Sequence, residues 1–163
     1  MTDVTDMLVD SRQVLTFILA EEEYAVDILR VQEIRGWSAV TRIPNAPDYM
    51  KGVLNLRGAI IPVIDLRLRF GFGARAYDQT TVIVVVWVNS GDRQRSIGLV
   101  VDAVAETYAI SNDEMSPAPL MGAGVEPDFI EGLATLDEKM IILLNLDYLL
   151  NSGDLALDES GSE

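Results

Sequence analysis

Short apolar runs separated by polar or glycine-containing turns recur along most of this chain. Runs at 14–19 and 24–27 flank a polar turn, and runs at 52–56 and 59–64 flank a turn at 57–58. Runs of this length, rich in β-branched and aromatic residues, are typical of strands, and a tight turn between two of them reverses the chain. Each pair therefore predicts a β-hairpin.

The second half of the chain continues the pattern with longer runs. Residues 80–88 and 96–104 are almost continuously apolar, which is typical of strands that are covered on both faces. Runs at 130–136 and 140–145 flank another polar turn. They predict a further hairpin.

Few segments carry a helical period. One short helical turn is expected at 147–150, with Asn145 or Asp147 as its N-cap. Many short strands at close spacing favour a barrel or a sandwich over alternating strands and helices. We therefore expect an all-β fold.

Composition limits what such a fold can do. The chain has 163 residues, of which 49% are hydrophobic, enough for one domain or two small joined subdomains with a real core. It contains no Cys and no His, which excludes disulfides, Cys/His zinc sites, Ser-His-Asp triads and Cys-His dyads. No apolar run reaches the roughly 18 residues that span a bilayer, and no secretion signal is evident, so a cytoplasmic protein without membrane insertion is expected.

Charge is strongly acidic and unevenly distributed. The net charge is −14. Residues 1–77 contribute −1 of it and residues 78–163 contribute −13. A nucleic acid partner is excluded, because binding phosphates requires a basic surface. Five arginines of the first half are candidates for a local positive patch, although solvated side chains are the simpler interpretation: Arg35, Arg42, Arg57, Arg67 and Arg69.

Candidate catalytic groups are few. Asp65 and Asp102 each end an apolar run and are the candidates for a carboxylate pair, but an aspartate that caps the following turn is the commoner arrangement. The glycines at 71–73 lack the third glycine and the Lys-Ser/Thr pair of a phosphate loop. Three successive glutamates at 21–23 are better interpreted as a solvated hairpin tip than as metal ligands, because adjacent side chains diverge. No catalytic constellation, metal or cofactor is predicted.

Four motifs between residues 31 and 67 resemble those of the CheW family of chemotaxis coupling proteins. They are VQEIRG at 31–36, VTRIPN at 40–45, KGVLNLRG at 51–58 and PVIDLR at 62–67. The similarity continues through the Pro-Ala-Pro at 117–119 to the end of the apolar body. Any one motif could arise by chance, whereas their shared order and spacing are specific.

The resemblance implies a fold and a function. The fold is two small five-stranded Src-homology-3-like β-barrels packed around a shared core, with short helices. Within a folded body at 14–150 we expect the first barrel mainly at 14–70, the second mainly at 80–136, and a C-terminal strand and helix at 139–150. Proteins of this family are non-enzymatic adaptors, which couple the cytoplasmic tip of chemoreceptors to the regulatory domain of the histidine kinase CheA within membrane receptor arrays. Further copies of the adaptor are additional partners.

The resemblance also assigns binding residues. The receptor contacts it implies are Val31, Glu33, Asn55 and Arg57. The kinase contacts it implies are Val40 and Ile43 on one side, and Leu120 and Met121 on another. This chain departs from relatives that carry an arginine before the Pro-Ala-Pro, and a charged residue and an aromatic after it, because it has Ser116, Leu120 and Met121. Whether this chain keeps the second kinase contact, and any ring assembly that depends on it, is therefore left undecided by the sequence.

Two other functions are compatible with this sequence. The first is a CheW-like module of a related protein, such as a receiver-fused coupling protein or the regulatory end of the kinase. The second is a β-barrel that binds or hydrolyses a small molecule through Asp65 and Asp102. Turnover or a ligand-induced thermal shift would identify the second.

The two ends of the chain predict the outcome of a truncation. Residues 1–13 and 151–163 are polar and mostly acidic, with too little apolar surface to bury, and are expected to form tails. Deleting 1–10 and 154–163 should therefore leave the fold intact. Thermal melting tests this, and the loss of a cooperative transition in the truncated protein would contradict it.

Overall fold

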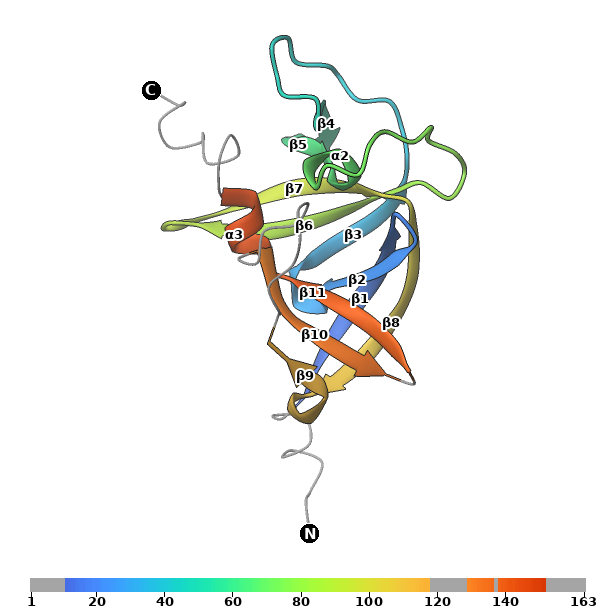
Figure 1. Cartoon of the computed structure of the whole chain (residues 1–163). Helices are drawn as coiled ribbons and strands as arrows, with labels where there is room; N and C mark the ends of the chain where they lie inside the picture. The colour runs from blue at the N-terminus through green and yellow to red at the C-terminus, as the bar shows by residue number, and fades with distance from the viewer. Residues whose placement is uncertain (1–10, 118–128, 137, 152–163) are drawn as a thin grey trace.

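The computed structural model describes residues 11–117, 129–136 and 138–151, which form two β-sheets and four short helices (Figure 1). The strands of sheet A are β1 (Ser11–Leu19), β2 (Glu22–Asp27), β8 (Ala103–Ser111), β9 (Met115–Ser116), β10 (Ile130–Leu136) and β11 (Lys139–Leu144). Those of sheet B are β3 (Val31–Gly36), β4 (Met50–Leu56), β5 (Ala59–Asp65), β6 (Val82–Ser90) and β7 (Arg93–Val101). The helices are η1 (Ile28–Arg30), α2 (Leu66–Arg69), η2 (Asn112–Glu114) and α3 (Leu146–Asn151).

The predicted hairpins are confirmed, and so is the all-β class. β1 pairs with β2, β4 with β5 and β10 with β11, all antiparallel. The structure adds a fourth antiparallel hairpin, β6 with β7. Arg57 and Gly58, between β4 and β5, have φ of 52° and 91°, values suited to a tight hairpin turn. Asn145 caps α3, since its Oδ1 accepts from the N–H of Tyr148 at 3.1 Å. No helix of the described residues is long and apolar enough to cross a bilayer.

Each of the two sheets combines strands from distant parts of the chain. The order of sheet A is β8-β1-β2-β11-β10-β9, and that of sheet B is β3-β6-β7-β5-β4. Sheet A therefore has six strands and combines both ends of the described chain, because β2 pairs in parallel with β11. Sheet B takes the middle of the chain and is joined internally by the parallel pair β5 and β7. Both proposed tails lie almost entirely outside the described residues.

The expected shared core lies between the two sheets. Alternate residues of β1, such as Leu15 and Phe17, pack there with alternate residues of β6, such as Val84 and Val86. The other face of β6 carries Ile83 and Val85, which belong to a separate cluster within sheet B. A third cluster fills sheet A. The apolar run of β6 is thus buried on both faces, as predicted, because its side chains alternate between two cores.

Asp102 joins the sheets where β7 of sheet B passes into β8 of sheet A. Its Oδ2 lies 2.8 Å from Nη1 of Arg67 and 3.4 Å from Nη1 of Arg75, and it accepts from the N–H of Ala20 at 3.0 Å. The side chain of Asp102 is only 11% exposed. A buried carboxylate is stable only when it is paired and hydrogen-bonded, and these contacts, which we call the Asp102 cluster, connect the β1–β2 turn to α2.

Replacing Asp102 with alanine is expected to lower the free energy of unfolding by about 3 kcal/mol, because Arg67 and the Ala20 N–H lose their common acceptor in a largely buried site. Chemical denaturation measures the difference. Asp92→Ala, which removes an exposed carboxylate from the β6–β7 turn, is the matched control and should change stability by less than about 0.5 kcal/mol. Equal effects of the two substitutions would contradict this role of Asp102.

Candidate functional site

Three of the four predicted receptor contacts meet at one end of sheet B. Nη2 of Arg57 lies 2.7 Å from Oε1 of Glu33, so an ion pair connects the β4–β5 turn to β3. Asn55 accepts from the N–H of Gly58 at 3.0 Å and thereby holds the turn. The Arg57 side chain remains 74% exposed. We call Glu33, Asn55 and Arg57 the Arg57 surface; it presents an accessible guanidinium in a turn of fixed shape.

Val31, the fourth predicted receptor contact, has a mixed role. It lies two residues before Glu33, across a β-bulge, and packs partly against the shared core. Its neighbours offer larger apolar surfaces, because Leu29 of η1 is 77% exposed and Ile34 of β3 is 44% exposed. Leu29 and Ile34 were not predicted as contacts. The sequence alone could not identify them as exposed. A three-residue helix or an edge strand is too short for its pattern of apolar residues to show which of them face solvent.

A compact cluster fixes η1, and with it Leu29. Arg30 forms two hydrogen bonds to the carboxylate of Asp147, at 2.7 and 2.9 Å, and its guanidinium lies 4.7 Å from the ring centre of Trp87. The indole N–H of Trp87 donates to the carbonyl of Leu29 at 3.0 Å. Hydrogen bonding from Arg30 lowers the pKa of Asp147. The cluster ties η1 to β6 and α3.

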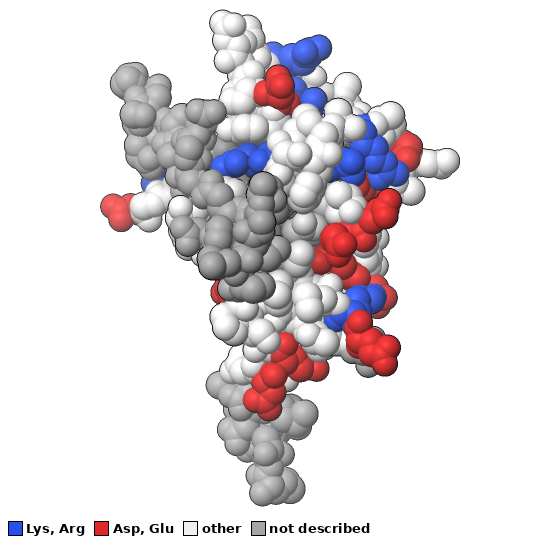
Figure 2. Space-filling view, viewed as in Figure 1, with Lys and Arg blue, Asp and Glu red and all other residues white. Residues whose placement is uncertain are grey.

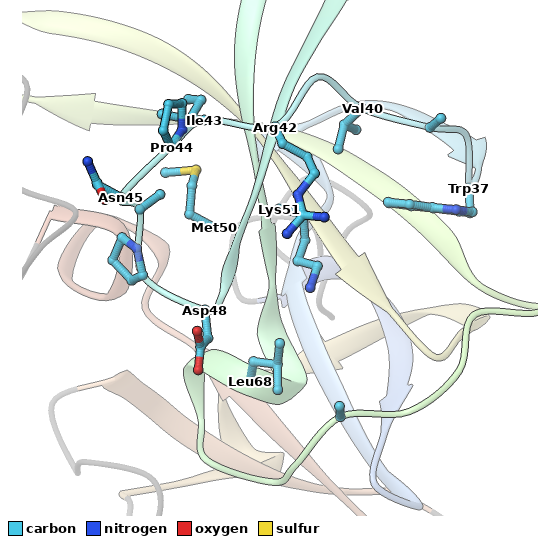
Figure 3. Close-up of a pocket in the computed structure, with 14 residues that line it drawn as sticks. Trp37, Val40, Arg42, Ile43, Pro44, Asn45, Asp48, Met50, Lys51 and Leu68 are labelled. Atoms are coloured by element: carbon cyan, nitrogen blue, oxygen red, sulfur yellow. The ribbon is translucent and has the colours of Figure 1, made fainter.

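The predicted kinase contacts Val40 and Ile43 line a groove of about 900 Å³, shown in Figure 3. Val40 is half-buried against the core of sheet B, whereas Ile43 is 43% exposed. The groove is lined mainly by the irregular segment 37–49, the start of β4 and Leu68 of α2, and we call it the Val40–Ile43 groove. The other two predicted kinase contacts, Leu120 and Met121, lie outside the described residues.

Backbone contacts hold one wall of this groove in place. Thr41 and Val53 exchange two hydrogen bonds, of 3.0 and 2.8 Å. This approach requires a glycine at position 52, where φ is 148° and a Cβ atom would overlap the carbonyl oxygen of Thr41. The wall is therefore preformed.

The arginines of the first half do not form a single patch. Arg35 and Arg57 both contact Glu33, and Arg67 belongs to the Asp102 cluster. The Arg69 guanidinium stacks near Tyr49 and Phe129, at 5.3 and 4.9 Å from the ring centres. On the face shown in Figure 2, cationic side chains lie mainly over sheet B and acidic ones over sheet A.

Of the three successive glutamates at 21–23, only the first two are exposed at the hairpin tip. Glu21 and Glu22 are exposed, but Glu23 is 9% exposed and its Oε1 lies 3.2 Å from Nζ of Lys139. The interpretation of Glu23 as solvated is wrong, because strand alternation turns its side chain inward, where a lysine compensates the charge.

The two aspartates considered for catalysis have separate structural partners. Asp65 accepts from the N–H of Leu68 at 3.2 Å, which confirms it as the cap of α2, and it also accepts from the hydroxyl of Tyr77. Asp102 is held by two arginines. The pair therefore does not form a shared acid–base site, and the hydrolytic alternative loses its candidate residues.

Comparison with known proteins gives a consistent result. A family model described as the CheW-like domain matches residues 13–154. The chain is 44% identical to the chemotaxis protein CheW of Klebsiella aerogenes, across 90% of this chain and 86% of the relative, and 37% identical to that of Rhizobium meliloti, across 86% and 88%. The crystal structure of the scaffolding protein TtCheW from Thermoanaerobacter tengcongensis superposes with a TM-score of 0.78 at 38% identity, covering 88% of this chain and 90% of that one.

The Arg30–Asp147 pair predicts a pH dependence of stability. Because the folded-state pKa of Asp147 is lowered, the pair stabilises the fold above the unfolded-state pKa of about 3.9 and loses its effect as the pH falls through the folded-state value. Asp147→Asn should therefore be less stable than the parent at pH 7, with a difference that shrinks only below about pH 4. Urea denaturation across this range tests it, and a difference independent of pH would contradict it.

Proposed function

Because this chain belongs to the CheW-like domain family, whose members are scaffolding proteins of chemotaxis rather than enzymes, we propose that it couples chemoreceptors to the histidine kinase CheA. In this proposal the receptor tip binds at Val31 and the Arg57 surface. The kinase regulatory domain binds in the Val40–Ile43 groove. A second kinase contact at Leu120 and Met121 belongs to the same proposal.

The Glu33–Arg57 ion pair is the observation that carries the receptor assignment. It brings residues 24 positions apart into contact at 2.7 Å while leaving the guanidinium largely exposed. An exposed ion pair adds little to stability, so folding alone does not account for an arginine held in this position. A guanidinium can bridge two acceptors of a partner in a fixed geometry, which suits the polar rim of a groove for a helical hairpin.

The separation of the two surfaces supports an adaptor. The Arg57 surface lies on β3 and the β4–β5 turn, whereas the Val40–Ile43 groove is lined mainly by segment 37–49, the start of β4 and Leu68 of α2. β4 contributes to both, with Asn55 at one end and Met50 at the other. Two partners bound at these surfaces would be connected through one rigid strand.

Arg57→Glu should separate folding from function. Its melting behaviour should match the parent within about 0.5 kcal/mol, because the side chain is exposed, whereas receptor binding should weaken by about 2 kcal/mol or more. Kinase binding should remain. Thermal melting and co-sedimentation with a receptor cytoplasmic fragment give both results from one preparation.

The charge-swapped double variant, Glu33→Arg with Arg57→Glu, is the matched control. It restores an ion pair between the same two positions but exchanges the charges offered to a partner. Receptor binding should stay lost if the partner contacts these charges. If Arg57→Glu unfolds, Arg57 is structural, and if it melts normally and still co-sediments, the receptor surface is misplaced.

A further inference from the structure

Two cations in the Val40–Ile43 groove lack ion-pair partners among the described residues. Arg42 and Lys51 both line the groove, and neither forms a salt bridge within the described part of the chain. The protein has 26 acidic and 12 basic residues, so most cations find a carboxylate nearby. Two unpaired cations in one concave site therefore call for an explanation beyond folding.

The surroundings of these cations define what the groove can accept. Figure 3 shows Arg42 and Lys51 among the side chains that line the groove, together with Met50 and Leu68. Val40, Ile43 and Met50 add apolar surface to the groove, which is open to solvent. Asp48 also lines the groove, is drawn apart from the two cations in Figure 3, and repels a second carboxylate. The groove thus fits one acidic side chain with apolar neighbours.

The groove is also rigid enough to be selective. Besides the Thr41–Val53 bridge, Trp37 packs against Tyr77 with ring centres 4.4 Å apart. The Tyr77 hydroxyl donates to Asp65. Burial, together with this hydrogen bond, raises the pKa of Tyr77. A preformed site loses less conformational freedom on binding.

From these observations we infer that the Val40–Ile43 groove recognises an acidic side chain of the kinase regulatory domain, which is held between Arg42 and Lys51 while Val40 and Ile43 contact its apolar neighbours. The inference rests on the proposed function and adds the chemistry of the partner. Charge complementarity favours this occupant over a second copy of the chain, because two copies at −14 each repel one another.

The test is the rate at which the isolated kinase regulatory domain associates with the full-length protein over a series of salt concentrations. Arg42→Glu and Lys51→Glu should each slow association by about tenfold at low salt, and the difference should shrink toward 1 M, where the Debye length is about 3 Å. Arg93→Glu is the matched control, because it makes the same charge change at an exposed position of the β6–β7 hairpin outside the groove. It should leave the rate close to that of the parent.

Each outcome separates the two proposals. Equal slowing by Arg42→Glu and Arg93→Glu would mean that only net charge matters, which overturns the inference. Val40→Glu and Ile43→Glu test the kinase surface itself: if both bind as the parent does, that part of the proposed function fails. If they lose binding while Arg42→Glu and Lys51→Glu do not, the kinase surface stands and the acidic contact is wrong.

Two other occupants would give different results. A second copy would show as a change in sedimentation mass in Arg42→Glu. The acidic residues at 154–163 would show as an increase in kinase association when they are neutralised in the parent, without an increase in the Arg42→Glu, Lys51→Glu double variant. Either result would overturn the assignment to the kinase.

Discussion

Alternation of side chains on β1, β2, β6 and β7 creates the apolar layer between the sheets, and the rest of the molecule is arranged around it. Each of these strands supplies one set of residues to the shared core and the other set to the interior of its own sheet. Such strands have no face left for a partner. Binding groups must therefore lie on turns, edges and the irregular segment 37–49, where the candidate surfaces are found.

Several of the charged side chains that approach this layer have an oppositely charged partner among the described residues. Asp102 is held by Arg67 and Arg75 at the junction of the sheets, and Glu23 by Lys139 at the end of sheet A. Arg30 and Asp147 fix the helices that flank the core. Of these, the Asp102 cluster lies at the junction of the two sheets, and a fixed relation between the sheets is what an adaptor needs if binding at one surface is to be transmitted to another.

Features that depend on residues close together in the sequence could be predicted, whereas features that depend on the pairing of distant segments could not. Three predicted hairpins, the burial of β6 on both faces and a helix cap at Asn145 or Asp147 follow from neighbouring residues, and the structure has Asn145 as the cap. The assignment of strands to sheets was not predicted, because it depends on the parallel pairs β2–β11 and β5–β7, which join distant segments without a turn between them. The role of Arg42 and Lys51 in the groove was not predicted either. The irregular segment that carries Arg42 has no periodic pattern, so the direction of its side chain cannot be inferred from the sequence.

The pairing of β2 with β11 has a consequence for folding during synthesis on the ribosome. Sheet A needs strands from both ends of the described chain, so a ribosome that has released residues 11–116 has delivered only β1, β2, β8 and β9 of its six strands. Until residues 130–144 emerge, one edge of β2 stays unpaired, and the shared core that contains Phe17 and Tyr24 lacks Ile130 and Leu144. Non-local pairing of this kind slows folding and leaves apolar surface open to aggregation. We therefore expect the nascent chain to be most prone to aggregation before residues 130–144 have been released.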